Sequence, residues 1–235
     1  MERNVILELR SLSSVHANGS PAVRDLSFTV EEGASVAVLG ANGAGKTSLF
    51  LTLTGILAIQ SGAVKAGGLE LNSKNAGAVR SAMGLVFQNP DDQLFMPTVW
   101  DDVLFGPRNL SLSEEECAGR ALASLRETGI EELKDRSPLH LSGGEKRMAA
   151  IAGVLAMRPK ILLLDEPTAF LDPKAIRSLG VVLKSLGQTK LIATHNLSFA
   201  REVCSKVLIL KKGALLTEGS ISLLDDKDVI EEAFF

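Results

Sequence analysis

The segment GANGAGKT, residues 40–47, constrains the fold of this chain more than any other feature. It follows the apolar run ASVAVLG at 34–40 and opens a helix-length segment at 45–57, so a strand, a glycine-rich loop and a helix are expected in that order. A loop of the pattern G-x-x-x-x-G-K-[ST] in this setting curves its backbone N–H groups around phosphate oxygens, and the helix N-terminus adds a partial positive charge. We expect Lys46 to reach the β- and γ-phosphates and Thr47 to bind magnesium.

Short continuous apolar runs predict strands that are covered on both faces by helices. They are ASVAVLG (34–40), GLVF (84–87), ILLLDE (161–166), LIATH (191–195) and VLIL (207–210). Helix-length segments such as 45–57 and 173–186 lie between several of them, which indicates a mainly parallel α/β core. The N-terminal segments ILELRS (6–11) and DLSFTVEEG (25–33) alternate apolar and polar residues, which is typical of antiparallel strands on a half-exposed sheet.

From Gln88 to about Pro159 the pattern changes, and we expect an inserted helical subdomain. Its segment SEEECAGRALASLRETG places apolar residues on one helical face, namely Cys117, Ala121, Leu122 and Leu125. Two helix starts in this region have the spacing of a capping box, Ser113 with Glu116 and Ser142 with Glu145. The second start, LSGGEKRMAAIAG, also has two glycines in its first turn, although glycine costs a helix interior roughly 1 kcal/mol relative to alanine.

Two carboxylates, Asp165 and Glu166, end the buried run ILLLDEP, where a parallel sheet exposes its ligand crevice. Asp165 suits the magnesium shell, and Glu166 suits polarising an attacking water. His195 ends the later run LIATH. A lone histidine at a strand end is more often a surface or capping residue, but its place after a parallel strand favours a catalytic role once a nucleotide site is granted.

The composition excludes several classes of protein for this chain. The 235 residues are 46% apolar and 23% charged, which is typical of an ordinary globular protein. A net charge of -3 gives no electrostatic case for nucleic acid, and no apolar run approaches the roughly 18–20 residues of a membrane-spanning helix. The charged N-terminus is no secretory signal, so we expect a cytosolic chain. Cys117 and Cys204 are isolated and are expected to be small buried hydrophobic residues.

The ordered set GANGAGKT, Gln88, LSGGE, ILLLDEP, FLD (170–172) and His195 resembles the nucleotide-binding subunit of ABC transporters over nearly the whole chain. The resemblance implies a P-loop NTPase fold, one ABC ATPase domain over residues 1–235, that hydrolyses ATP with Mg²⁺. The core with its N-terminal antiparallel β-subdomain would comprise 1–87 and 159–235, and the helical subdomain about 88–158.

The same resemblance implies a role for each matching residue. Gln88 would touch magnesium and signal to the membrane subunit, and Asp172 would contact a partner ATPase subunit. His195 would hold the γ-phosphate, and His16 would stack on adenine where relatives often have a tyrosine. The expected catalytic residues are Glu166, His195, Lys46 and Gln88, and the expected magnesium ligands are Thr47, Gln88 and Asp165. The loop residues expected to bind ATP are Gly40, Ala41, Asn42, Gly43, Ala44, Gly45, Lys46, Thr47 and Ser48.

A dimer is implied by the LSGGE segment. In this family such a helix start closes over ATP held by a second subunit, so Ser142 and the N–H groups of Gly143 and Gly144 would touch the partner's γ-phosphate, and side chains on the glycines would block it. Two ATP molecules would join two subunits head to tail until hydrolysis opens them. Glu145 replaces the usual glutamine and adds a negative charge near a triphosphate, unless capping turns it back. Phe170 stands where a small residue is common and is expected to stiffen the contact loop.

The stretch VFQNPDDQLFMPTVWDDVLFGPRNLSLS, 86–113, resembles the ATPases of energy-coupling-factor importers, especially the cobalt and nickel branch. We expect about half of its apolar residues to be core and the rest to form a patch covered by a membrane partner; they are Leu94, Phe95, Met96, Val99, Trp100, Val103, Leu104 and Phe105. The expected partners are an identical or related second ATPase subunit, a transmembrane scaffold and a substrate-binding membrane subunit, at the cytoplasmic face of the membrane. The cargo rests on resemblance alone, because no segment has metal-ligand spacing.

Other functions stay open. The chain could serve a vitamin importer of the energy-coupling-factor type. A soluble ABC ATPase acting on DNA or ribosomes is disfavoured because the chain has neither a long coiled coil between the motifs nor a second ATPase domain. A binding module that no longer hydrolyses ATP is disfavoured by Lys46, Glu166 and His195.

Overall fold

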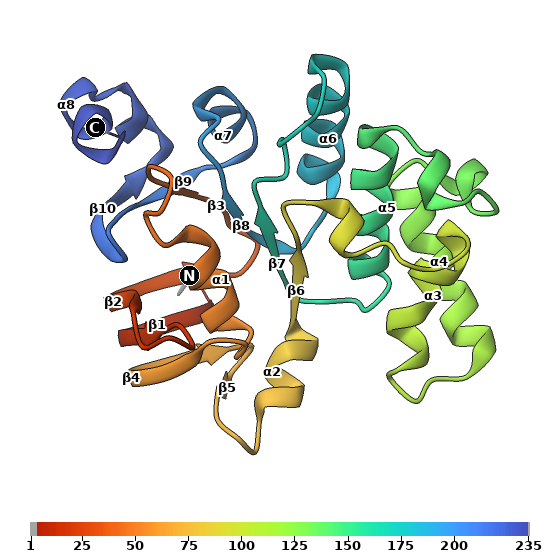
Figure 1. The fold of residues 1–235 in the computed structure, drawn as a ribbon, viewed down its shortest axis with the longest axis horizontal. Coiled ribbons are helices and arrows are strands. Elements are labelled where there is room, and N and C mark those ends of the chain that lie inside the picture. The colour runs from red at the N-terminus through yellow and green to blue at the C-terminus, as the bar shows by residue number, and fades with distance from the viewer. Residues whose placement is uncertain (1–3, 235) are drawn as a thin grey trace. The chain divides into compact units, whose positions relative to one another are not determined.

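The computed structural model describes residues 4–234 (Figure 1). The strands are β1 (Val5–Val15), β2 (Pro21–Glu31), β3 (Ser35–Leu39), β4 (Ala58–Ala66), β5 (Leu69–Glu70), β6 (Met83–Val86), β7 (Ile161–Asp165), β8 (Thr189–Ala193), β9 (Lys206–Lys211) and β10 (Ala214–Ser220). The helices are α1 (Lys46–Leu53), α2 (Ala76–Ala82), α3 (Val99–Arg108), α4 (Glu114–Glu127), α5 (Gly143–Leu155), α6 (Pro173–Ser185), α7 (Leu197–Val203) and α8 (Lys227–Phe234).

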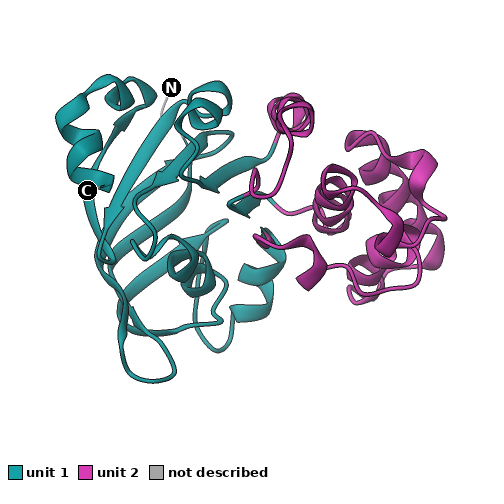
Figure 2. Ribbon diagram, turned by 45° about the horizontal axis from the view of Figure 1, so that its top comes forward, with its two compact units in different colours: residues 1–85, 160–166, 188–235 teal, residues 86–159, 167–187 magenta. Residues whose placement is uncertain are grey.

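The chain divides into two compact units (Figure 2). Unit 1 comprises the chain up to residue 85, residues 160–166 and the chain from residue 188 onward, and it contains both sheets. Unit 2 comprises 86–159 and 167–187 and is built mainly from helices. The division therefore differs from the expected one, because 167–187, with α6, groups with the helices and not with the core.

Close packing inside unit 2 explains why α6 belongs to it. A Cβ at Gly144 in α5 would lie 2.9 Å from the Cβ of Ala175 in α6, and a Cβ at Gly143 would lie 3.5 Å from the carbonyl oxygen of Phe170. Gly144 thus lets the start of α6 approach α5 more closely than a side chain would permit, whereas a Cβ at Gly143 would make only an ordinary van der Waals contact. This contact is between residues distant in sequence, so periodicity gave no sign of it.

Among the described residues, the strands of unit 1 form two sheets. A four-stranded sheet has the order β2-β1-β4-β5, and β1 is antiparallel to both β2 and β4. A six-stranded sheet has the order β10-β9-β3-β8-β7-β6, in which β3 is parallel to β8 and β9, and β7 is parallel to β8. The predicted α/β class, with a mainly parallel sheet and an N-terminal antiparallel sheet, is confirmed.

The hydrophobic core of unit 1 draws side chains from both sheets and from α1. The alternation in β1 and β2 buries one face of each strand, as with Leu7, Leu9 and Leu26, whereas all five residues of β7 and of β8 are buried. Helix α1 contacts β2, β4 and β7, so it lies between the two sheets. The continuous apolar runs therefore became the strands covered on both faces.

The register of the parallel strands positions the site. Ala193 of β8 pairs with Val38 of β3 on one side and with Asp165 of β7 on the other. These three strands consequently end at the same level, and the segments that leave them meet at one edge of the sheet. Those segments are the loop after β3, Glu166 after β7, and His195 after β8.

In unit 2, α5 contacts α3, α4 and α6. Cys117, Ala121 and Leu125 of α4 are fully buried, and Leu122 is half-buried, as the periodicity predicted. The capping box predicted at the start of α4 is only half formed. Ser113 accepts the backbone N–H of Glu116, but the Glu116 carboxylate pairs with Arg120 at 2.6 Å. The prediction was wrong on that point because an arginine one turn along competes for the carboxylate.

Candidate functional site

The loop predicted to bind phosphate joins the end of β3 to the start of α1. Gly40, Gly43 and Gly45 have φ angles of 145°, 79° and 102°, which residues with a Cβ rarely adopt. A Cβ at Gly40 would also lie 2.3 Å from the carbonyl oxygen of Leu210 in β9. Gly45 is the N-cap of α1 and has no side chain to cover the N–H groups of the first turn. The start of α1 is therefore suited to an anion.

Lys46 is the first residue of α1, and its side chain turns back over the loop. Its Nζ donates to the carbonyl oxygens of Gly40 at 2.8 Å and Ala41 at 3.3 Å. It also lies 3.6 Å from Oε1 of Glu166, and the two side chains are 7% and 9% exposed. The loop therefore holds a mostly buried cation beside the first turn of α1, where phosphate oxygens would be neutralised.

Thr47 and Asp165 bring two oxygen atoms together. The Thr47 hydroxyl donates to Oδ2 of Asp165 at 2.7 Å, and Asp165 is the last residue of β7 and 4% exposed. Magnesium prefers oxygen ligands and keeps water and substrate phosphate oxygens in its shell. Since a hydroxyl and a carboxylate lie side by side at the loop predicted to bind phosphate, these two residues fit the expected ion.

Glu166 and His195 form a close pair at the sheet edge. Oε2 of Glu166 lies 2.9 Å from Nδ1 of His195 and accepts the His195 backbone N–H at 3.3 Å. The backbone N–H of Glu166 donates to the carbonyl oxygen of Ala193 at 2.8 Å. Glu166 has φ of 41°, a conformation that costs a non-glycine residue roughly 1–3 kcal/mol and is typical of functional sites. The His195 side chain is 63% exposed, so one member of the pair faces solvent.

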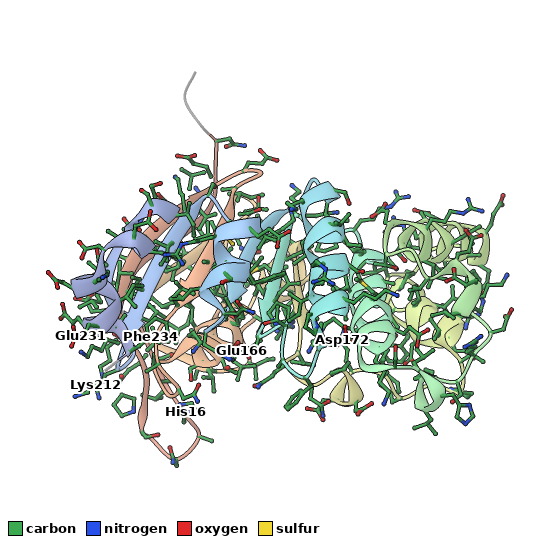
Figure 3. All side chains as sticks on the ribbon, turned by 90° about the horizontal axis from the view of Figure 1, so that it is seen from above. His16, Glu166, Asp172, Lys212, Glu231 and Phe234 are labelled. Atoms are coloured by element: carbon green, nitrogen blue, oxygen red, sulfur yellow. The ribbon has the colours of Figure 1, made fainter. Side chains whose placement is uncertain are left out.

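His16 and the C-terminal helix also reach this region of unit 1. His16, labelled in Figure 3, follows β1 in the turn before β2. Its Nε2 lies 3.5 Å from the hydroxyl of Ser48 in α1. The backbone N–H of Ala41 donates to the carbonyl oxygen of Ala233 in α8 at 3.3 Å. This second contact was not predicted, because nothing in the sequence of α8 indicates its partner.

The capping box predicted at the start of α5 is confirmed. The Ser142 hydroxyl oxygen accepts the N–H of Glu145 at 3.4 Å, and the Glu145 carboxylate accepts the N–H of Ser142 at 2.7 Å. Hydrogen bonds from Ser142 hold the pKa of Glu145 below its ordinary value. The packing of Gly144 against Ala175 supplies a reason for that glycine within the chain, beside the partner phosphate expected from the resemblance.

Gln88 lies in unit 2 with an exposed side chain, and its backbone is held by an arginine for which no role was predicted. Arg147 of α5 is 1% exposed. Its Nη1 donates to the carbonyl oxygen of Phe87 at 2.6 Å, and its Nη2 donates to that of Gln88 at 2.5 Å. Both peptide groups that flank the Gln88 Cα are therefore fixed. The signal was an arginine amid the apolar residues of α5.

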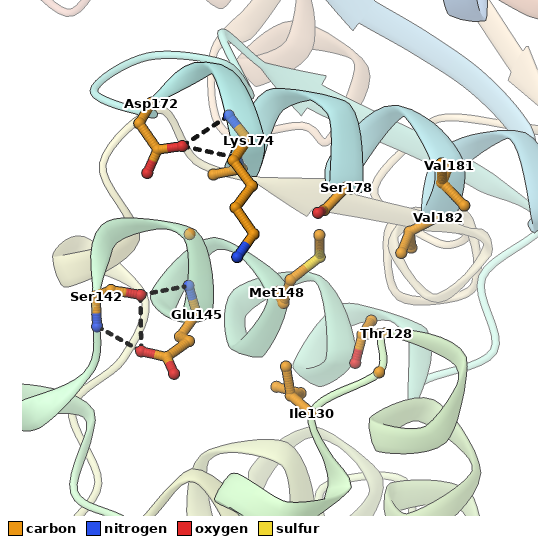
Figure 4. Close-up of a pocket in the computed structure, with 13 residues that line it drawn as sticks. Thr128, Ile130, Ser142, Glu145, Met148, Asp172, Lys174, Ser178, Val181 and Val182 are labelled. Carbon is orange, nitrogen blue, oxygen red and sulfur yellow. Dashed lines mark hydrogen bonds between the residues drawn. The ribbon is translucent and has the colours of Figure 1, made fainter.

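Asp172 and its neighbours belong to unit 2 as well. Asp172 caps α6 by accepting the N–H groups of Lys174 at 2.8 Å and Ala175 at 2.9 Å, and these bonds lower its pKa. A cavity between the starts of α5 and α6 is lined by Ser142, Glu145, Asp172 and Lys174 (Figure 4). Phe170 is 85% exposed with φ of 63°, a conformation that glycine adopts more easily.

The apolar residues after Gln88 divide between core and surface. Val99, Val103 and Leu104 are buried, Leu94, Met96 and Trp100 are half-buried, and Phe95 and Phe105 are 63% and 44% exposed. The two phenylalanine rings stack edge to face with centroids 5.1 Å apart. Asp102 accepts the N–H groups of Phe95 and Met96 through one carboxylate oxygen, and burial raises its pKa.

Two further findings concern residues 4–234. None of their helices is both long and apolar enough to cross a membrane. Within the same span, no cluster of three or more histidine, cysteine, aspartate or glutamate side chains has an arrangement that could hold a metal ion. Cys117 and Cys204 are buried and free, and burial raises the pKa of Cys204 to about 12.

Comparison with known proteins places the chain in a family. The family model described as ABC transporter matches residues 23–169, more than half of the 235 residues. A putative ABC transporter ATP-binding protein of Geobacter sulfurreducens is 45% identical over 214 residues, which are 91% of this chain and 86% of that protein. The energy-coupling factor transporter ATP-binding protein EcfA of Carboxydothermus hydrogenoformans is 40% identical over 232 residues, 97% of this chain and 86% of the relative.

Solved structures agree with the sequence matches. The structure of cbiO1 from Clostridium perfringens, part of the ABC transporter complex cbiONQ, has a TM-score of 0.87 and 38% identity and covers 97% of this chain and 94% of its own. The ATP-binding cassette MJ0796, solved as a dimer bound to ADP and Pi, has a TM-score of 0.79 and 26% identity and covers 92% of this chain and 99% of its own. The chain therefore belongs to the ABC transporter ATP-binding proteins and is an ATPase of that family, with relatives of the energy-coupling-factor type.

Proposed function

We propose that this ATPase energises an importer of the energy-coupling-factor type, with cobalt or nickel ions as cargo. The observation that carries the ATP chemistry is the convergence of Lys46, Glu166 and His195 at one sheet edge, beside the phosphate-binding loop. The importer assignment is supported by the EcfA relatives and by cbiO1, which is part of the ABC transporter complex cbiONQ.

In the proposed reaction, the backbone of residues 40–48 holds the phosphates of ATP and Lys46 neutralises the β- and γ-phosphates. Lys46 would exchange its contacts with Gly40 and Glu166 for phosphate oxygens. Glu166 would then accept a proton from the attacking water, and His195, 2.9 Å from Glu166, would hold the γ-phosphate. His16 would stack on adenine, because its ring lies near Ser48 of α1.

Thr47 and Asp165 would hold the magnesium ion, and Gln88 would be a further ligand. Bound magnesium would neutralise charge on the phosphate oxygens. The Thr47 to Asp165 hydrogen bond of 2.7 Å supports this assignment, since it places both oxygen ligands next to each other before ATP arrives.

A second ATPase subunit, identical or related, would complete each ATP site. Ser142 and the N–H groups of Gly143 and Gly144 would contact the γ-phosphate bound to the partner, and Asp172 would lie at the contact between subunits. The exposure of Ser142 and Gly143 at the start of α5 supports this, because a partner's phosphate could reach them. The dimeric MJ0796 cassette provides a related precedent for dimer formation.

The apolar surface around Phe95 and Phe105 would be covered by a transmembrane scaffold subunit, which would itself carry a substrate-binding membrane subunit. Two exposed aromatic rings in edge-to-face contact make a surface suited to an apolar partner. The chain would accordingly work at the cytoplasmic face of the cell membrane, without contacting nucleic acid. A vitamin as cargo remains the alternative, because the EcfA relatives do not name a cargo.

Two experiments test the proposal. ATP hydrolysis is measured for the wild type and for Lys46→Ala over protein concentrations that allow dimerisation, and equal inactivity of both would refute the proposed chemistry. The chain is then isolated from its native membrane with whatever is bound to it. A transmembrane scaffold with a small membrane subunit that binds cobalt or nickel supports the importer, whereas a ribosome or a DNA complex would overturn it.

A further inference from the structure

The carboxylate of Glu145 engages both polar hydrogens of Ser142. Its Oε2 accepts the Ser142 backbone N–H at 2.7 Å and the Ser142 hydroxyl at 2.7 Å. A serine hydroxyl has a single proton to donate. While this contact exists, the Ser142 hydroxyl therefore cannot donate a hydrogen bond to any other group.

The bond is charge-assisted and hence strong. Hydrogen bonds to an ionised carboxylate are about twice as strong as neutral ones, and here one oxygen atom receives two of them. They stabilise the start of α5, since the N–H of Ser142 would otherwise have no partner within the helix. The carboxylate also places a negative charge in the first turn of this helix.

A phosphate group offers only acceptor oxygens, so at this helix start it requires donors. The inference rests on the proposed function, in which the partner's γ-phosphate binds here. Glu145 and that phosphate then compete for the same hydroxyl proton, and their negative charges repel each other. The bond that stabilises the separate subunit thereby opposes closure of the dimer.

We infer that Glu145 sets the ATP concentration at which the dimer closes, because its carboxylate must release the Ser142 hydroxyl before that hydroxyl can bind the partner subunit's ATP. Glu145 is a positioning residue in this role, since it acts through Ser142. The separate subunit therefore has the capping box formed, and the partner's ATP must displace the Glu145 carboxylate from the Ser142 hydroxyl.

The test measures ATP-driven dimerisation by light scattering, with slowly hydrolysing Glu166→Gln protein as the background. Glu145→Gln keeps an acceptor oxygen for Ser142 but removes the charge, so the ATP concentration for half-maximal dimerisation is expected to fall roughly five- to tenfold. The matched control is Glu116→Gln in α4. Glu116 holds the same position after Ser113, but its carboxylate pairs with Arg120, so that variant should dimerise at the unchanged ATP concentration.

A double-mutant cycle shows whether the effect passes through the hydroxyl. In a Ser142→Ala background, where only the charge repulsion remains, Glu145→Gln should lower the ATP concentration by roughly twofold, clearly less than when the hydroxyl is present. An equal fall with and without the hydroxyl, or no fall at all, would overturn the inference. Melting curves check that each variant folds, and Glu145→Asp, which shortens the reach to Ser142, is expected to shift dimerisation in the same direction. If no variant dimerises with ATP, the proposed dimer itself is refuted, and the inference with it.

Discussion

Replacing Glu166 by glutamine should separate ATP binding from hydrolysis. The carboxylate lies 3.6 Å from Lys46 Nζ and 2.9 Å from His195 Nδ1, so its removal changes the surroundings of both a cation and a histidine. Loss of a general base typically lowers the rate about 10²- to 10⁴-fold, so the turnover rate should fall by that factor, which corresponds to an activation barrier higher by about 2.7–5.4 kcal/mol. Phosphate release at saturating ATP measures it.

The same substitution should tighten ATP binding. At an effective dielectric constant of about 20, unit charges 3.6 Å apart attract by roughly 4–5 kcal/mol, most of which desolvation offsets. Without the carboxylate, Lys46 is free to turn to phosphate and one source of repulsion is gone. We expect the free energy of ATP binding to become more favourable by about 1 kcal/mol, which lowers the Kd roughly fivefold. Without ATP, the free energy of unfolding should fall by about 1–3 kcal/mol. The loss is limited because Lys46 keeps its hydrogen bonds to two carbonyl groups.

A fluorescent ATP analogue measures the Kd, and urea denaturation with and without ATP measures the stability. Glu127→Gln, an exposed carboxylate of α4, is the control and should change neither quantity. A turnover rate within threefold of the wild type would remove Glu166 from the role of base. A weaker affinity for ATP would refute the electrostatic account of the Lys46 to Glu166 pair.

Three further outcomes concern α5. Gly144→Ala places a Cβ 2.9 Å from that of Ala175 and should cost about 1–3 kcal/mol in chemical denaturation, whereas Gly119→Ala, with nothing within 4 Å in α4, should stabilise by up to about 1 kcal/mol. Hydrogen bonds from Ser142 lower the pKa of Glu145, so the stability that the carboxylate contributes should be present above the ordinary pKa of 4.5 and disappear as the pH falls through the folded-state pKa. The difference in free energy of unfolding between the wild type and Glu145→Gln, measured in urea from pH 7 to pH 3, should therefore become smaller toward acid pH. Arg147→Lys should cost about 1–3 kcal/mol, because a single ammonium replaces a planar fork that holds two carbonyl groups, and an unchanged unfolding midpoint would contradict this.

Features that depend on short spacing could be predicted from the sequence. The glycine-rich loop between β3 and α1, the strands with continuous apolar runs and the capping box of Ser142 and Glu145 all follow from neighbours within a few residues. The box of Ser113 and Glu116 shows the limit of such rules. Its spacing is the same, yet Arg120 takes the carboxylate, so a local pattern specifies which bonds are possible and a nearby competitor decides which form.

The function class could also be predicted from the sequence, because the ordered motifs of an ABC ATPase occur together, and the family comparison confirms the family. For the candidate site, the sequence predicted which residues are involved but not which of their side chains are in contact. That Thr47 touches Asp165, or that Glu166 lies between Lys46 and His195, depends on strands far apart in sequence ending at one level of the sheet.

The sequence by itself determined the loop, the helix start and the chemistry that each residue can perform, since these depend on backbone dihedral preferences and on short-range hydrogen bonds. Only the tertiary structure decided that α6 groups with the helical unit, that Arg147 holds the backbone at Gln88, and that α8 reaches Ala41. The physical reason is that such contacts join residues many positions apart. Their formation depends on how side chains of several elements fill a shared space, which no periodicity along one element records.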